Sequence, residues 1–170
     1  LKDVTVMKNF LLNYTENYGY DYFFLVDSDL ILKPETLQTL INANRDIVAE
    51  VFWTKWTPEG MEMPNAWMFD HYEFSPKMEF KHWRNKGLYQ VGMSGACILV
   101  HRKVIESGVN YSPIYNVSHS VWEDRAFCIR AAVHGFEIWL DTTCPPEHLY
   151  RQTKPIKPSS DKRKQPHQTK

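Results

Sequence analysis

Two aspartates that flank a serine, Asp27 and Asp29 around Ser28, are the residues whose spacing most directly suggests chemistry. They follow the apolar run Tyr22–Val26, whose lack of polar–apolar alternation predicts a strand buried on both faces. Residues at the carboxyl end of such a strand lie at the crevice where open α/β sheets bind ligands. Two carboxylates repel each other there unless one takes up a proton or a cation lies between them. A hard divalent ion that also holds a substrate phosphate explains both acids, and a solvated turn is the alternative.

A second acidic pair, Glu123 and Asp124, lies at the start of a predicted helix that ends near Gly135. Ser120 stands three residues before Glu123, which is the spacing of a capping box and gives Glu123 a structural role. Asp124 has no such role beyond a favourable interaction with the helix dipole. His148 follows the last predicted strand, where a single histidine is more often a surface or packed residue than a ligand.

The turn before the apolar strand Cys97–Val100 is rich in small residues, among them Gly92, Ser94 and Gly95. These glycines precede a strand rather than a helix, so they do not form a phosphate-binding loop of the dinucleotide type. One interpretation is a tight turn or bulge before a buried strand. The other is a turn whose backbone approaches a ligand closely, because glycine has no side chain. The two interpretations are compatible.

The acidic pairs and the histidine follow one another in an order known from a protein family. The three motifs are Asp27-Ser28-Asp29, Glu123-Asp124 and His148. From about Leu11 to Tyr150 the chain resembles GT-A fold glycosyltransferases, in particular family 2-like enzymes with DxD, ED and C-terminal His motifs. The resemblance implies that Asp29 and His148, with Asp27, bind Mn²⁺ or Mg²⁺. It also implies that Asp124 is the general base, while Glu123 orients and caps.

The activity implied by this resemblance is that of a hexosyltransferase-type enzyme with a nucleotide-diphosphate sugar as donor. The acceptor would be a hydroxyl of a sugar, lipid or protein, and the anomeric carbon would be inverted. The residues implied in substrate binding are Asp27, Ser28, Gly92, Ser94, Gly95 and Trp122. Two alternatives stay open, a haloacid-dehalogenase-like phosphatase with Asp27 as nucleophile and a non-catalytic sugar-binding or scaffold domain.

Apolar spacing predicts an α/β fold for residues 1–150. The helical spacing of one apolar stripe predicts an N-terminal helix that packs on a sheet, with Val4, Met7, Leu11, Tyr14 and Tyr18 on the packed face. Pro34 begins a second predicted helix, and 47–52 is a further strand, so a right-handed parallel crossover is expected. With the resemblance, the expected architecture is a GT-A (Rossmann-like), mostly parallel sheet flanked by helices. The strand–helix–strand half that holds the nucleotide in this family is not found, and we expect it upstream in a longer chain.

Region 53–86 combines prolines with many aromatic residues and predicts a long loop. Its rings either form a small satellite core or, in one or two cases, line an acceptor site by stacking on the C–H faces of sugars. The sequence does not distinguish between these two uses.

Charge divides the chain into an acidic domain, residues 1–150, and a basic tail, residues 151–170. The tail holds seven of the 20 Lys and Arg residues but one of the 20 Asp and Glu residues, so the rest has a net charge of −6. An acidic domain suits a metal site and argues against nucleic-acid binding. The tail is expected to be disordered and could contact a membrane surface. Three cysteines without CxxC spacing predict reduced, buried thiols in a cytoplasmic protein, and no apolar run approaches about 18 residues.

Overall fold

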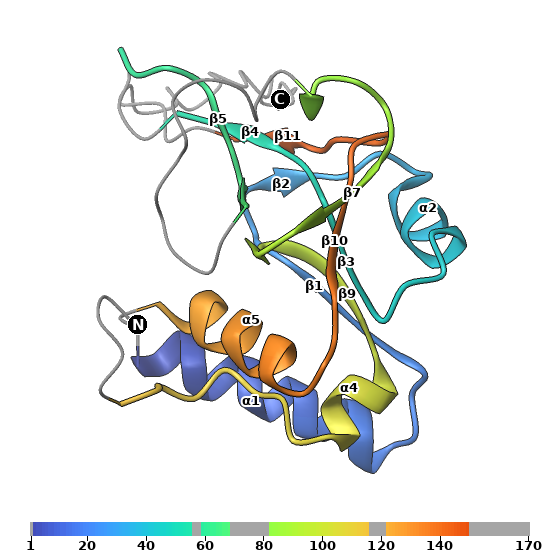
Figure 1. Ribbon diagram of the computed structural model, residues 1–170, viewed down its shortest axis with the longest axis vertical. Helices are drawn as coiled ribbons and strands as arrows, with labels where there is room; N and C mark the ends of the chain where they lie inside the picture. Colours follow the sequence, from blue (N-terminus) through green and yellow to red (C-terminus); the bar gives the residue numbers. More distant parts are fainter. Residues whose placement is uncertain (1, 56–58, 69–81, 116–121, 150–170) are drawn as a thin grey trace, which may run out of the picture.

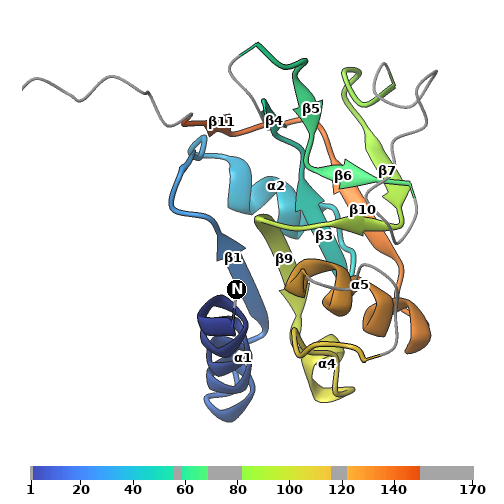
Figure 2. The same ribbon diagram turned by 90° about the vertical axis from the view of Figure 1, so that its left-hand side faces the viewer.

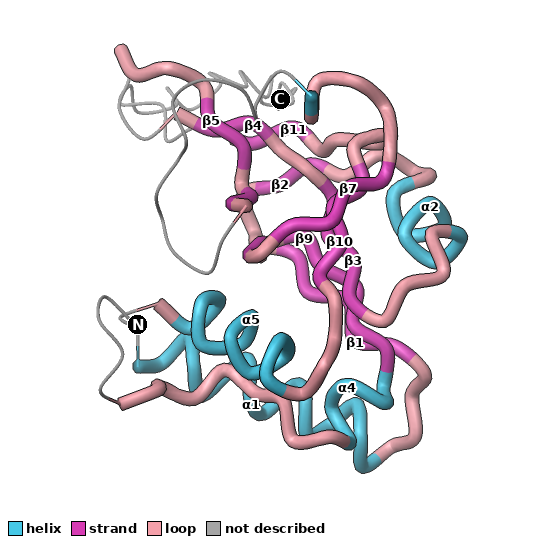
Figure 3. The backbone as a smooth tube through the Cα atoms, in the orientation of Figure 1, coloured by secondary structure: helices cyan, strands magenta, loops and turns pink. Residues whose placement is uncertain are grey.

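The chain forms an α/β structure around a central five-stranded sheet (Figure 1; Figure 3). The computed structural model describes residues 2–55, 59–68, 82–115 and 122–149. In spatial order the strands of the sheet are β1 (Tyr22–Val26), β9 (Cys97–His101), β3 (Ile47–Glu50), β10 (Ile138–Asp141) and β7 (Leu88–Val91). The predicted basic tail lies outside the described residues.

The sheet is mixed, so the predicted mostly parallel sheet is wrong. Only β3 and β10 pair in parallel, whereas the pairs β1–β9, β9–β3 and β10–β7 are antiparallel. Strands β1 and β3 do run in the same direction, as the predicted crossover through α2 (Thr36–Asn42) requires. They are not neighbours, however, because β9 lies between them. The crossover from β1 to β3 therefore leaves one strand position open between them. Strand β9, which comes later in the chain, occupies that position and runs in the opposite direction.

Helices cover both faces of the sheet, as predicted. One face packs against α1 (Lys2–Asn17), α4 (Arg102–Glu106) and α5 (Glu123–Val133), and the other packs against α2. These three helices lie together at the bottom of Figure 1, away from α2. Strand β1 contributes to both sides, with Phe23 and Leu25 in the larger core and Phe24 in the smaller one. The predicted burial on both faces is confirmed only in part, because Phe24 and its alternating neighbours are half-buried.

Helix α1 packs on the core with a different face from the predicted one. The stripe of Val4, Met7, Leu11, Tyr14 and Tyr18 is exposed, with exposed fractions from 36 to 67%. The buried residues of α1 are Lys8, Leu12 and Thr15. A lysine takes a core position here because carboxylates from another element surround its ammonium group.

Three short two-stranded ribbons stand beside the sheet. They are β2 (Leu30–Ile31) with β11 (Glu147–His148), β4 (Trp53–Thr54) with β5 (Met63–Pro64), and β6 (Ala66–Trp67) with β8 (Met93–Ser94). Region 53–86 is therefore partly strand. Trp67 and Trp83 are buried in the main core, so they do not form the predicted satellite core.

Two further expectations concern the thiols and the membrane. All three cysteines, Cys97, Cys128 and Cys144, are buried and unpaired, as predicted. Within the described ranges, no helix combines the length and the apolar character needed to cross a bilayer.

Candidate functional site

The candidate residues gather at one edge of the sheet. Strands β1, β3 and β10 point the same way, so Asp27, Glu50 and Asp141 all lie at the edge where these strands end. Figure 2 shows β11, β4, β5 and β6, which belong to the three ribbons, at this edge of the sheet. The position agrees with the rule that open α/β sheets bind ligands beyond the carboxyl ends of their strands.

Asp29 and His148 meet at this edge although they lie far apart in the sequence. Strand β11 pairs with β2 so that His148 lies opposite Leu30, and the Leu149 amide donates to the Asp29 carbonyl over 2.8 Å. The Nε2 atom of His148 then lies 3.4 Å from Oδ2 of Asp29. The DxD triplet and the C-terminal histidine thus form one local structure.

The imidazole ring of His148 is held on two further sides. Its Nδ1 lies 3.3 Å from the Thr54 hydroxyl, and its ring stacks on Phe52 with 5.3 Å between centroids. A proton on Nδ1 would be donated to Thr54 and would leave the lone pair of Nε2 directed to the side of Asp29. Histidines that bind metals commonly donate their second ring nitrogen to such a partner.

The Asp29–His148 pair fits two neighbouring ligands of one divalent ion. Ligands about 2.1 Å from an octahedral Mg²⁺ lie about 3 Å apart, close to the observed contact of 3.4 Å. Among the residues that the structure describes, no group of three His, Cys, Asp or Glu side chains could hold an ion. Asp27 therefore does not complete such a group. Further ligands would have to come from water and substrate phosphate, which Mg²⁺ commonly uses.

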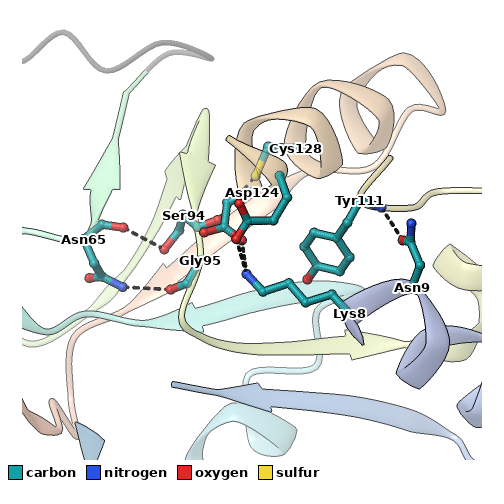
Figure 4. Close-up of polar contacts among 9 residues, drawn as sticks. Lys8, Asn9, Asn65, Ser94, Gly95, Tyr111, Asp124 and Cys128 are labelled. Carbon is teal, nitrogen blue, oxygen red and sulfur yellow. Dashed lines mark hydrogen bonds and ion pairs between the residues drawn. The ribbon is translucent and has the colours of Figure 1, made fainter. Parts of the chain in front are cut away.

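A buried lysine links the second acidic motif to α1 (Figure 4). Lys8 Nζ lies 2.8 Å from Glu123 Oε1 and 2.7 Å from Asp124 Oδ1. The side chains of Lys8 and Glu123 are 4% and 9% exposed, whereas that of Asp124 is 30% exposed. Of the two acids, Asp124 is therefore the one that a substrate can reach more readily.

The predicted capping box is wrong. Helix α5 begins at Glu123, with Trp122 as its N-cap residue and no side-chain capping bond, so Glu123 is not at the third helical position. Ser120 lies outside the described residues. The side chain of Glu123 instead accepts a hydrogen bond from Lys8.

Burial and neighbouring charges shift the pKa values of Asp124, Lys8 and Asp27. Burial raises the pKa of Asp124 above its ordinary value, and Lys8 opposes that rise. Burial acts to lower the pKa of Lys8, but its contacts with Asp124 and Glu123 outweigh burial and raise it. Asp27 is exposed as a residue, but partial loss of hydration of its carboxyl raises its pKa, against the opposing charge of Lys8.

Asp27 also connects the two halves of the site. Its pKa is raised further by Asp29 and by Glu123, and the charge of His148 acts to lower it. Asp27 is thus close enough to both the Asp29–His148 pair and the Lys8 cluster to interact electrostatically with each.

The small-residue turn approaches Asp124 so closely that a side chain at Gly95 would displace the Asp124 carboxylate. A Cβ atom added to Gly95 would lie 2.7 Å from Cγ of Asp124. The left-handed residue of the turn is Ala96, with φ of 68°, and its carbonyl accepts the Asp27 amide over 2.8 Å. A non-glycine residue in this conformation is uncommon and marks a place where the surroundings enforce the backbone. The structural interpretation, a tight turn before a buried strand, is therefore confirmed, and the close approach of its backbone to a ligand stays a prediction.

Asn65 fixes this turn from the other side. Its Nδ2 donates to the Gly95 carbonyl over 3.1 Å, and its backbone carbonyl accepts a hydrogen bond from the Ser94 hydroxyl (Figure 4). The same Nδ2 also donates to the Glu50 carbonyl over 3.2 Å. Of the other predicted substrate-binding residues, Gly92 donates its amide to the Trp67 carbonyl, while Ser28 and Trp122 are exposed.

Lys8 and Asn65 are the residues that sequence reasoning missed. Lys8 lies off the most apolar stripe of its helix, so the predicted packed face did not include it. Asn65 follows Pro64 in a region that predicted only a loop. No sequence signal identifies either residue, because each is placed by partners far along the chain.

Comparisons with protein-family models and with curated proteins gave no match for this chain.

Proposed function

We propose that the chain carries the metal-binding and proton-accepting part of a glycosyltransferase that uses a nucleotide-diphosphate sugar. The single observation that supports it most is the contact between Asp29 and His148, 3.4 Å apart at the carboxyl edge of the sheet. Asp124 lies in the same neighbourhood, because the charge of Asp27 acts on it and that of its neighbour Glu123 acts on Asp27.

Asp29 and His148 are the residues that would hold Mn²⁺ or Mg²⁺. A divalent ion at this position supplies Lewis-acid stabilisation of the charge that develops on a departing diphosphate. Thr54 and Phe52 fix the ring of His148, so little rearrangement of the histidine is needed. Asp27 adds negative charge nearby, which favours a cation at this edge.

Asp124 is the residue that would take the proton from the acceptor hydroxyl. It is the more exposed carboxylate of its pair, and the Gly95 turn leaves backbone rather than a side chain against it. Burial raises its pKa, which brings a carboxylate closer to the range where a general base works well near neutral pH. Glu123 would hold Lys8. Attack of the hydroxyl from the face opposite the leaving diphosphate would invert the anomeric carbon.

The metal site can be tested without knowing the substrate. Titration with Mn²⁺, followed by electron paramagnetic resonance with and without uridine diphosphate, should show binding in the native protein. Asp29→Ala and His148→Ala should each weaken Mn²⁺ binding at least about tenfold, since each removes a ligand. Asp46→Ala is a matched control, because Asp46 is a surface carboxylate that pairs with Lys103.

Equal Mn²⁺ affinity in all three variants would refute the metal assignment. Transfer is tested separately, by incubating the protein with a panel of nucleotide-diphosphate sugars and acceptors and measuring the nucleoside diphosphate released. Trapping of a phosphoryl group on Asp27 would instead favour the phosphatase alternative. Binding of sugars without any turnover would favour the scaffold alternative.

A further inference from the structure

Lys8 is a charged residue at a core position, and nothing in the sequence predicted a role for it. Its side chain is 4% exposed, and its ammonium contacts two carboxylates on α5. Burying an ammonium group is unfavourable unless it is paired and hydrogen-bonded. Here Glu123 and Asp124 supply that pairing at 2.8 and 2.7 Å.

We propose that Lys8 is a positioning residue for Asp124, which it holds beside the Gly95 turn in the ionised form that can accept a proton. The proposal rests on the proposed function of Asp124 as the general base. Lys8 itself does not contact the reacting atoms in this scheme. It acts through its bond to Asp124 Oδ1, which leaves the second carboxylate oxygen next to Gly95, where an added Cβ would lie 2.7 Å from Oδ2.

The surroundings of Lys8 leave it little freedom. Its ammonium lies 5.1 Å from the ring centroid of Tyr111, which in turn stacks on Phe127 at 4.6 Å. The next residue of the helix, Asn9, accepts the Tyr111 amide over 2.8 Å and donates to the Ser112 hydroxyl over 3.0 Å. Figure 4 shows Lys8 and Tyr111 side by side, with Lys8 directed at Asp124. Lys8 and Asn9, which are consecutive in α1, thus bind the acidic pair and the neighbouring segment 111–112.

The charges around Asp124 explain why a cation is needed there. Glu123 and Asp27 act on Asp124 with the same sign of charge, and burial also disfavours its ionised form. Tyr111 is buried, and among the described residues its hydroxyl has no hydrogen-bond partner. Cys128 has its thiol directed to the Ser94 carbonyl. Among these neighbours from α1, α5, the end of β1 and the Tyr111 segment, Lys8 is the group that favours the carboxylate.

The decisive experiment follows the titration of Asp124 itself rather than activity. Carbon-13 NMR of the aspartate carboxyl groups, assigned with Asp124→Asn, should give its midpoint in the native protein, in Lys8→Met and in Lys8→Arg. Loss of a cation in contact should raise the midpoint by about 1 to 3 pH units in Lys8→Met. Lys8→Arg keeps the charge and should restore most of the native value. Lys103→Met removes the exposed partner of Asp46 and should leave Asp124 unchanged.

A pH profile of transfer adds a second readout. The acidic limb of kcat/KM should move upward in Lys8→Met by the same amount as the Asp124 midpoint, whereas loss of stability alone would lower the rate without moving the limb. Where no nucleotide sugar is turned over, the proposed function fails, and the NMR titration still decides whether Lys8 controls Asp124.

An unchanged Asp124 midpoint in folded Lys8→Met would overturn the proposal. If that variant does not fold, the native protein provides the test. The nitrogen-15 signal of Lys8 Nζ should shift with the same midpoint as the Asp124 carboxyl carbon, because the two groups share a hydrogen bond. Independent titration of the two signals would also overturn it.

Discussion

Two acidic clusters lie at the same edge of the sheet, and they are neutralised in different ways. In the first, Glu123 and Asp124 surround the ammonium group of Lys8, and Asp124 keeps contact with solvent. In the second, Glu50 and Asp141 are register partners at the ends of β3 and β10 and are 0% and 6% exposed. Burial, with a further contribution from Asp141, raises the pKa of Glu50 to about 8, against smaller opposing effects of the Cys144 amide and Lys33.

The difference shows how a buried acid can be used. The buried Oε2 of Glu50 has no hydrogen-bond partner among the described residues, and burial together with the nearby Asp141 favours its protonated form. These two acids stand side by side only as register partners of neighbouring strands. Asp124, by contrast, is held by a lysine and lies beside a glycine, so it can stay ionised and exchange a proton with a bound hydroxyl. The cluster with a cation is the better candidate for chemistry.

Substitution of Asp124 is the strongest test of this difference between the two acidic clusters. Asp124→Asn should lower the transfer rate by about 10²–10⁴, because a general base typically contributes that much. Glu123→Gln should reduce the rate far less, since its amide oxygen can still accept a hydrogen bond from Lys8. Transfer rates, Mn²⁺ affinity and melting temperatures of both variants should be measured, and Mn²⁺ affinity should stay near the native value.

The opposite ranking would mean that the proton acceptor is Glu123. If both variants melt far below the native protein, the Lys8 cluster would be a structural element like the Glu50–Asp141 pair. Asp46→Asn serves as the control, because it removes a carboxylate that has an exposed lysine partner.

The second cluster, Glu50 and Asp141, should make the stability of the fold depend on pH. Because the folded state keeps a proton on Glu50 that the unfolded chain has lost above its ordinary pKa of 4.5, stability should fall as pH rises from 4.5 to 8. Between pH 4.5 and 7 that loss is on the order of 3 kcal/mol. Glu50→Gln keeps an acceptor for the Cys144 amide and a donor for Asp141 without a titrating proton. The variant should therefore be the more stable protein at pH 8, with the advantage shrinking toward pH 5.

Urea unfolding at several pH values measures this slope. Glu106→Gln changes an exposed carboxylate that pairs with Arg102, and it should leave the slope unchanged. A slope that is the same in Glu50→Gln and in the native protein would show that Glu50 is ionised in the folded state.

Sequence reasoning located strand β1, with Asp27 and Asp29 after its end, correctly, because a continuous apolar run followed by acids is a local signal. Both ends of Tyr22–Val26 agree with the structure. Sequence reasoning could not predict the direction of strand β9, because an apolar run such as Cys97–Val100 looks the same in parallel and antiparallel pairs. Strand direction depends on which neighbours the strand finds.

The candidate site shows the same limit at the level of side chains. The context of His148 was visible in the sequence, but its contact with Asp29 depends on the pairing of β2 with β11. The position of Lys8 depends on a charge pair with α5, which overrides the apolar stripe of α1. Contacts of this kind join residues more than a hundred positions apart, and periodicity within one helix does not contain them.

The smallest expected effect concerns the Thr143 hydroxyl, which donates to Asp141, the second acid of the Glu50–Asp141 cluster. Asp141 Oδ1 accepts the Thr143 amide over 2.7 Å and the Thr143 hydroxyl over 2.5 Å. Thr143→Val removes the hydroxyl and should lower the free energy of unfolding at pH 7 by about 1 kcal/mol, as for a typical hydrogen bond. Thr143→Ser keeps the hydroxyl and should cost much less. Combined with Glu50→Gln, the effect should be non-additive, because both residues act on Asp141. Strict additivity of the two unfolding free energies would mean that Glu50 and Asp141 do not share a proton.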